Sequence, residues 1–408
     1  MKYWLLIALV AGSVQAAPPA TPGLLPTKVV RPLIDGDPEV AAARATREIL
    51  KQDAALARAS PYEWSVKASA QRRSVEPGLR YNEWNVGLDR TLRLPGKARA
   101  DRDIASATIN EGEARYGEAL HETARELLEL WLNWTEAEQT VLLAASQVKA
   151  AKDNFESVEK RVKAGDAAKL DAGIARAELG EQQRAASDAR TTANVAWAKL
   201  HARFPDLPRS FTEVPEPIVV EGNAAVLRAR IIEQSDELKI SEALFSKAQA
   251  QTARFRADRI PDPTVGVFTA SEVGGRERLT GVMLTIPIPG AIRKGRADKS
   301  VNTAEVSRQE LELKKRELDA VISATLASAS GAFESWQIAE SSATAMRENG
   351  QLMQRAYALG EADLQALLTA RRQAASAAQG ALTTKVAAAR AYYSLLVDAH
   401  LVWDMNHE

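Results

Sequence analysis

An apolar stripe at coiled-coil spacing runs along a very long stretch of the first half of the chain. Positions 120, 124, 127, 131, 134, 138, 141, 145 and 148 step by three and four residues, and all but Glu138 are apolar. Such a stripe is typical of a helix packed in a coiled coil. The pattern predicts one helix from Lys97 to Ala164, roughly 100 Å long at 1.5 Å per residue. No ordinary globular domain holds a helix of this length.

Composition agrees with long, solvated helices and excludes several functions. Charged residues make up 26% of the chain and aromatic residues only 5%, which is typical of long coiled helices. Lys plus Arg and Asp plus Glu both number 53, a balance that argues against a nucleic-acid binder. The chain has no cysteine, so disulfides, thiolate metal sites and a lipid-bearing cysteine are all excluded.

Short motifs recur in the same order at an offset of about 195 residues, which predicts two copies of one structural unit. A linker over residues 205–222, rich in proline, separates the copies at 38–204 and 223–408. The matching motifs are Leu94-Pro95-Gly96 with Ile288-Pro289-Gly290, Arg99-Ala100-Asp101-Arg102 with Arg296-Ala297-Asp298-Lys299, Gly165-Asp166-Ala167 with Gly360-Glu361-Ala362, and Ala175-Arg176 with Ala370-Arg371.

Each copy is predicted to contain a helix, two strands, a very long helix, a turn and a final helix. In the first strand Trp64, Val66 and Ala68 alternate with polar residues at the period of two that a half-apolar strand requires. In the next strand the apolar parity changes, which predicts a bulge near Glu83. The strands are expected at 64–72, 79–94, 263–271 and 278–288, and the helical hairpins are expected to turn near 165 and 360.

These strands have the length and alternation of membrane-spanning barrel strands. Four strands cannot close a barrel, and an open edge in lipid costs several kcal/mol for each unpaired backbone group. The strands therefore either form a soluble sheet capped by helices, or several chains share one barrel, with eight strands from two copies or twelve from three. Aromatic residues at strand ends, such as Tyr62 and Tyr81, favour the membrane. The candidate lipid-facing residues are Trp64, Val66, Trp84, Val86, Leu88, Val282, Leu284 and Ile286.

The N-terminus has the layout of a secretory signal peptide. One lysine precedes a short apolar run from Leu5 to Ala11, and small residues follow, so residues 1–16 are expected to be removed by cleavage after Ala16. The alternative is an uncleaved anchor or a buried helix. A Pro-rich extension is expected over 17–37. No later segment is long and apolar enough for a membrane-spanning helix, so the mature protein is expected to be periplasmic or a β-barrel.

From about Glu39 to Trp403 the chain resembles the TolC-like outer membrane efflux proteins. The most specific element lies at the helix-to-helix turn, where a glycine is followed by an aspartate at the sixth position and Ala-Arg at the tenth and eleventh. The turns at Leu94-Pro95-Gly96-Lys97-Ala98-Arg99 and near Pro289-Gly290 resemble the branch paired with heavy-metal resistance-nodulation-division pumps. The turn motif reads Gly165, Asp171, Ala175 and Arg176 in the first copy and Gly360, Ala366, Ala370 and Arg371 in the second.

The resemblance implies a mainly α protein with a membrane β-barrel portion, in which three copies supply twelve strands to one outer-membrane barrel and their helices continue as a periplasmic tube. It further implies a passive exit duct whose tip, at the two glycine motifs and Leu364, docks a periplasmic adaptor and through it an inner-membrane pump. Some family members carry acidic residues at the sixth and ninth positions of the second motif, where this chain has Ala366 and Thr369.

Enzyme and metal functions find little support in the residues. The four histidines are scattered, and without cysteine a zinc site is not expected. His121 is expected on a helix surface, and Trp131 and Trp134 are expected to pack between helices. No carboxylate pair can be nominated as acid and base, and no cofactor is expected. The rival class is a periplasmic adaptor or structural coiled-coil protein, although adaptors usually carry one helical hairpin and this sequence predicts two.

Overall fold

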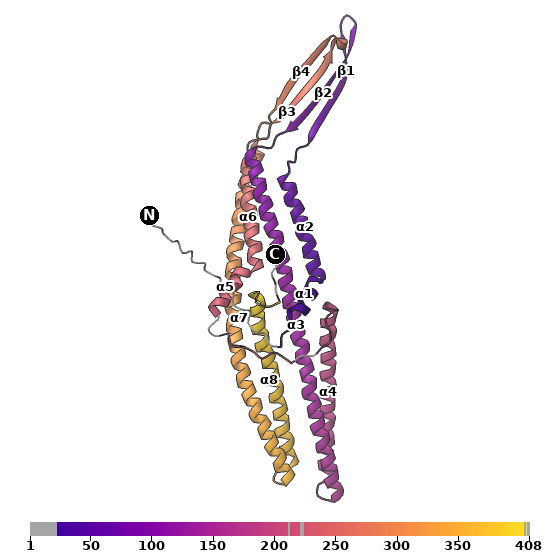
Figure 1. Ribbon diagram of the computed structural model, residues 1–408, viewed down its shortest axis with the longest axis vertical. Coiled ribbons are helices and arrows are strands. Elements are labelled where there is room, and N and C mark those ends of the chain that lie inside the picture. Colours follow the sequence, from indigo (N-terminus) through magenta and orange to yellow (C-terminus); the bar gives the residue numbers. More distant parts are fainter. Residues whose placement is uncertain (1–22, 211–212, 221–223, 404, 406–408) are drawn as a thin grey trace, which may run out of the picture. The chain divides into compact units, whose positions relative to one another are not determined.

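A computed structural model describes residues 23–210, 213–220, 224–403 and 405. The expected signal peptide at 1–16, its cleavage point and the start of the Pro-rich extension lie outside the described residues. The chain divides into two compact units. The sheet unit comprises residues 34–126 and 225–327, and the hairpin unit comprises the segment up to Leu33 together with residues 127–224 and 328–406. Each unit therefore combines segments from both halves of the chain (Figure 1).

The element order repeats along the chain, and corresponding helices have nearly equal lengths. The long helix has 70 residues in the first half and 69 in the second, and the helix that returns from the turn has 35 in both. The segment expected as a Pro-rich extension contains a short helix, α1 (Thr27–Asp35). The first half continues with α2 (Pro38–Arg58), β1 (Trp64–Val75), β2 (Leu79–Thr91), α3 (Pro95–Ala164) and α4 (Lys169–Arg203). The second half contains α5 (Ala224–Gln234), α6 (Asp236–Ala257), β3 (Thr264–Glu272), the short 3₁₀ turn η1 (Val273–Gly275), β4 (Glu277–Thr285), α7 (Ala291–Leu359) and α8 (Leu364–Asp398).

The four strands form one antiparallel sheet in the order β1-β2-β3-β4. The pairing of β1 with β2 runs without interruption from Trp64 opposite Arg90 to Val75 opposite Leu79. The predicted bulge near Glu83 is therefore wrong. The register is unbroken, and the parity change arises because Tyr81 lies on the otherwise polar face, where its ring adjoins Gly274 of the neighbouring loop.

Two strands end earlier than predicted. The strand expected at 79–94 stops at Thr91, because the Leu94 N–H donates to the Asp262 carboxylate at 3.0 Å instead of to a neighbouring strand. The strand expected at 278–288 stops at Thr285, shortly before Pro287, which has no N–H to donate.

In the sheet unit, four helices pack side by side in the order α2, α3, α6, α7 (Figure 1). The pair α2 and α3 is joined by Arg47, which binds Glu113 at 3.4 Å and lies over the Tyr116 ring. Lys247 of α6 binds Glu111 of α3 at 3.0 Å. Thr252 of α6 donates to the Ser300 carbonyl of α7 at 2.9 Å. The row therefore passes from the first half of the chain to the second only once, at the contact of α3 with α6.

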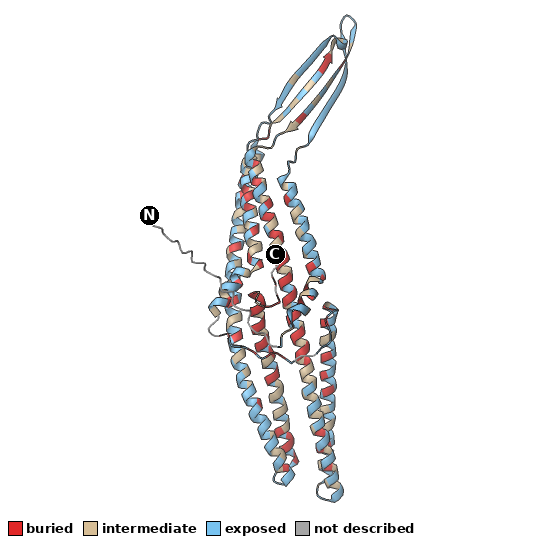
Figure 2. Cartoon of the chain, viewed as in Figure 1, coloured by how far each residue is buried: buried red, intermediate tan, exposed pale blue. Residues whose placement is uncertain are grey.

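In the hairpin unit, α3 packs against both α4 and α8. The coiled-coil stripe is buried from position 120 to position 134, and Trp131 and Trp134 are almost inaccessible to solvent, so their predicted role in packing is confirmed (Figure 2). Trp134 contacts Trp197 of α4 with ring centroids 4.9 Å apart. On the other side Thr383 of α8 donates to Glu136 at 3.0 Å. The helices therefore follow the order α4, α3, α8, α7.

His121 is buried, so its expected position on a helix surface is wrong. The stripe on α3 is wider than the heptad positions alone, because α6 covers the neighbouring face of the helix. Burial raises the pKa of the adjacent Glu118 to about 7, with His121 opposing the shift and the carboxylates of Glu237, Glu122 and Asp236 adding to it.

Candidate functional site

One face of the sheet is apolar over its full width and open to solvent in the single chain. The strand register places Val66, Leu88, Val267 and Val282 in one row across all four strands. The row on one side holds Trp64, Arg90, Val265 and Leu284, with the Arg90 guanidinium over the Trp64 ring. All eight candidate lipid-facing residues are exposed, and Val282 reaches 85% exposure. Trp64, Val66, Trp84, Val86, Leu88, Val282 and Leu284 share this apolar face, and Ile286 follows β4 with the same parity.

The opposite face of the sheet is more polar, and four of its charged side chains form two ion pairs. Lys67 binds Asp89 at 3.0 Å. Glu83 is nearly buried, accepts a hydrogen bond from Gln71 at 2.9 Å and forms an ion pair with Arg73 at 3.4 Å. A sheet with one apolar and one polar solvated face is the pattern of a barrel wall between lipid and water.

A buried charge network lies where the strands join the helices. Lys97, in the first turn of α3, is 1% exposed and binds Asp258 at 3.1 Å and Asp262 at 3.0 Å. Asp262 also accepts from the Tyr62 hydroxyl at 2.8 Å. Arg254 of α6 joins the network by binding Asp101 at 2.7 Å and pairing with Asp258. These contacts connect the two halves of the chain at the base of the sheet, and we call them the junction network.

Hydrogen bonds to the ionised carboxylates stabilise the junction network at neutral pH. Burial by itself would raise the pKa of Asp262, but donors from Leu94, Tyr62 and Lys97 outweigh burial and lower the pKa. The same balance lowers the pKa of Asp258, with Arg254 and Lys97 as donors. Because both pKa values lie lower in the folded state, this stabilisation is present above pH about 4 and is lost as the pH falls through the lowered values.

The sequence analysis interpreted Pro95-Gly96-Lys97 only as a turn that starts a helix, and it assigned no role to Lys97. A lysine that enters the first turn of a helix is usually solvated, and its partners lie more than 150 residues further along the chain. The sequence signal was therefore present only as two aspartates and a tyrosine near the strand starts, with nothing to pair them with Lys97.

Both predicted helix-to-helix turns are glycine turns of the same geometry. Gly165 and Gly360 have φ of +86° and +78°, the left-handed conformation that favours glycine. In each turn the next residue donates its N–H back to the preceding helix, from Asp166 to the Arg161 carbonyl at 2.8 Å and from Glu361 to the Ala356 carbonyl at 2.9 Å. This is the Schellman arrangement, which satisfies carbonyls at the helix end.

The remaining residues of the turn motif divide between packing and exposure. Ala175 and Leu364 are buried in one apolar cluster with Val158, Tyr357, Leu367 and Leu368, and this cluster joins the two hairpins. Ala370 is buried as well, and Asp171 lies half-buried in the first turn of α4. Arg176 is exposed, with its guanidinium over the Phe155 ring at 5.5 Å.

Arg371 holds the two hairpins together from within. It donates to the Ala150 carbonyl of α3 at 3.0 Å and to the Gln354 side chain of α7. Burial lowers its pKa, and Asp153 and Glu178 oppose that shift. Exposed apolar side chains flank the turns instead: Leu170 is 72% exposed and Leu359 is 74% exposed. The sequence analysis did not single out these two leucines.

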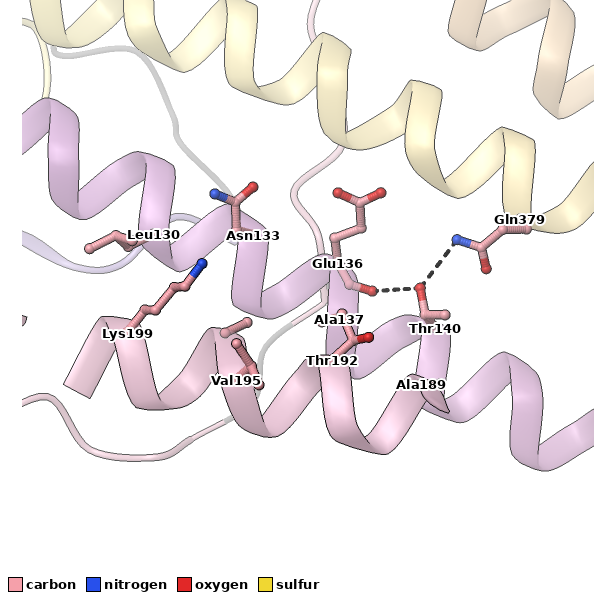
Figure 3. A pocket seen from close by; sticks show the side chains of 11 residues that line it. Leu130, Asn133, Glu136, Ala137, Thr140, Ala189, Thr192, Val195, Lys199 and Gln379 are labelled. Carbon is pink, nitrogen blue, oxygen red and sulfur yellow. Dashed lines mark hydrogen bonds between the residues drawn. The ribbon is translucent and has the colours of Figure 1, made fainter. Parts of the chain in front are cut away.

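A groove of about 470 Å³ opens between α3 and α4 where small residues face each other (Figure 3). Its lining includes Ala137 and Ala189, with Gln379 reaching in from α8. The Thr140 hydroxyl on its wall donates to the Glu136 carbonyl at 2.9 Å and accepts from Gln379 at 3.2 Å. These polar groups therefore serve to hold α3 against α8.

The described residues were also compared with the requirements of a membrane-spanning helix and of a metal site. None of the described helices is long and apolar enough to cross a membrane. Among the same residues, no group of three or more His, Cys, Asp or Glu side chains is arranged to hold a metal ion.

Comparison with known proteins places this architecture. The family model described as outer membrane efflux protein matches residues 29–203. Among solved structures, the outer-membrane channel OprN has a TM-score of 0.70 at 18% identity, covering 92% of this chain and 90% of that one. The Campylobacter jejuni CmeC outer membrane channel has a TM-score of 0.68 at 14% identity, covering 93% and 86%. The open state of the Neisseria gonorrhoeae MtrE outer membrane channel has a TM-score of 0.67 at 16% identity, covering 93% and 90%. No curated protein sequence matched the chain.

The fold is that of the TolC-like outer-membrane channels, with a helical portion and a small β-sheet. The family model covers 175 of the 408 residues, all of them in the first half of the chain. The solved structures that the fold resembles are described as outer-membrane channels.

The two faces of the sheet give a first prediction. Val86 lies on the apolar face of β2 and Asn85 next to it on the polar face. Val86→Arg should destabilise the folded protein in membranes by about 2–4 kcal/mol if the site is near mid-membrane. Asn85→Arg should be tolerated. Unfolding titrations in lipid vesicles measure both, and equal costs on the two faces would show that the strands do not enter lipid.

The junction network gives a second prediction. Lys97→Met leaves buried carboxylates without their cation, so it should lower the free energy of unfolding by about 3–5 kcal/mol. When samples are heated to a series of temperatures before electrophoresis, the folded band of this variant should disappear at a lower temperature. Arg99→Met is the matched control, because Arg99 is exposed on the same helix turn, and it should change stability by less than about 0.5 kcal/mol. Equal stability of the two variants would contradict a role for the network.

Proposed function

We propose that this chain is the outer-membrane exit duct of a tripartite efflux system and acts as a trimer. The observation that carries the proposal is a sheet with an exposed apolar face and two free edges. Among the described residues, the outer edges of β1 and β4 pair with no other strand. Backbone groups at such an edge cannot remain unpaired in lipid, so the edges need partners from other copies.

A trimer supplies twelve strands, an even number within the range of closed outer-membrane barrels. The polar face would then line the lumen and the apolar face would meet lipid. The lumen charges Lys67, Asp89, Arg73 and Glu83 are paired within the wall. This suits a passive conduit that releases what a pump delivers.

The glycine turns at the ends of the hairpins would dock a periplasmic adaptor, and the adaptor would connect the duct to an inner-membrane pump of the resistance-nodulation-division type. The strand-to-helix turn sequences favour the branch of such pumps that serves heavy metals. Within the tip, the exposed Leu170, Leu359 and Arg176 are available for docking, whereas Leu364, Ala370 and Arg371 pack inside the protein.

The rival function, a periplasmic adaptor or structural coiled-coil protein, does not require the apolar sheet face. A soluble protein would leave Val66, Leu88, Val267 and Val282 in water in one continuous row. Exposed apolar patches of this kind mark an interaction with membrane or protein. The row therefore favours the duct.

The tip assignment gives a third prediction. The double variant Leu170→Asp with Leu359→Asp, expressed in a strain from which the gene for this chain is deleted, should give no more resistance than the deletion strain alone. A charged tip cannot bind an apolar partner surface. Heat-modifiable oligomer in the outer-membrane fraction should stay at the level of the unaltered protein. Leu142→Asp is the control and should keep resistance, because Leu142 is 60% exposed on α3 and lies away from the turn.

Loss of the oligomer in the tip variant would show that the two leucines are structural. Full resistance in that variant would place docking elsewhere. A soluble periplasmic monomer in the unaltered protein would overturn the duct itself.

A further inference from the structure

On the polar face of the sheet, one aromatic side chain lies between two glycines. The strand register places Phe268 of β3 opposite Gly87 of β2 on one side and opposite Gly281 of β4 on the other. Lys67 of β1 completes this row. All of these residues lie on the face opposite Val267 and Val282, which is the lumen side under the proposed function.

The Phe268 ring lies over Gly281. A Cβ atom placed on Gly281 would come within 2.7 Å of the ring Cε1 atom and 2.8 Å of Cζ, closer than carbon atoms pack. On the other side, a Cβ on Gly87 would lie 3.5 Å from the Phe268 Cβ atom. Neither glycine has a positive φ, so the backbone conformation does not require glycine at either position. Gly281 therefore provides the space that the ring occupies, whereas a Cβ on Gly87 would make only an ordinary contact with the Phe268 Cβ atom.

Glycine weakens a strand, and its presence inside one often marks a close approach by another group. Covering a strand glycine with an aromatic ring is a known way to restore that stability. Here the same packing keeps a bulky side chain against the wall. Without the space at Gly281, the ring would have to point away from the sheet, since side chains occupy only a few staggered orientations.

We propose that Phe268 sets the width of the lumen at its level in the barrel, and that Gly281 holds the channel open by giving its ring a recess in the wall. The inference rests on the proposed function, because the polar face must line the lumen. Each copy in a trimer contributes one such ring at the same height. Raising all three rings would narrow the passage for bulky molecules while leaving small ones able to pass.

The absence of cysteine from the chain makes this testable. Ser65 lies on the same face, opposite Asp89, one row nearer the helices than Phe268. A reagent that enters from the strand loops must therefore pass the level of Phe268 to reach the thiol introduced by Ser65→Cys. The probe is a maleimide attached to a polyethylene glycol chain, applied to intact cells, and its labelling rate is compared with that of a small maleimide. Both reagents enter from the loop side, so closure of the helical tip does not affect the comparison.

With Ser65→Cys as the parent, the added change Gly281→Ala should slow labelling by the bulky reagent and leave the rate with the small one unchanged. Adding Phe268→Ala should restore the bulky-reagent rate, because a double-mutant cycle separates the ring from the added methyl group. Thr280→Val, next to Gly281 on the apolar face, is the control and should change neither rate.

A bulky-reagent rate that is unchanged by Gly281→Ala would overturn the inference. An equal fall with and without Phe268 would also overturn it. If the thiol introduced by Ser65→Cys fails to react in the parent even with the small reagent, the polar face does not line an aqueous lumen, and it is the proposed function that fails.

Discussion

The unpaired backbone at the outer edges of β1 and β4 is the constraint on which the rest of the molecule depends. The described residues of one chain provide four strands, each with an apolar and a polar face, and lipid cannot satisfy the N–H and C=O groups along the two outer edges of that sheet. Closure by further copies removes both edges at once. It also explains why Val282, on an edge strand, is among the most exposed apolar side chains of the single chain.

The internal repeat joins the two halves of the chain at several levels. Each unit takes segments from both halves. The contact between halves therefore recurs in the sheet as β2 with β3, in the sheet unit as α3 with α6, and in the hairpin unit as α3 with α8. The junction network of Lys97, Asp258 and Asp262 ties the halves where strands become helices. Arg371 and the apolar cluster around Leu367 tie them again near the turns.

Periodic features were predictable from the sequence because they depend on local geometry. The stripe through Trp131 and the alternation through Val66 each follow from the repeat of one element, and the structure buries or exposes those residues as the patterns require. What could not be predicted depends on partners distant in the chain. The parity change at Tyr81 resembled a bulge because its neighbour, the loop at Gly274, was not adjacent in sequence. The structural roles of Lys97 and Arg371, and the recess around Phe268, likewise require knowing which strands and helices lie side by side.

The most direct measurement of the central claim is disulfide cross-linking between the edge strands of different copies. Cysteine at Ala68 in β1 can be combined with cysteine at each position from Arg278 to Leu284 in β4, in a chain that has no other cysteine. A disulfide forms only where the Cα atoms come within about 4.4–6.8 Å of each other. If three copies close one barrel, one or two positions on the apolar face should cross-link between chains. The cross-linked bands on a denaturing gel should then end at a covalent trimer. A panel without cross-links between chains, or bands that continue past the trimer, would contradict closure by three copies.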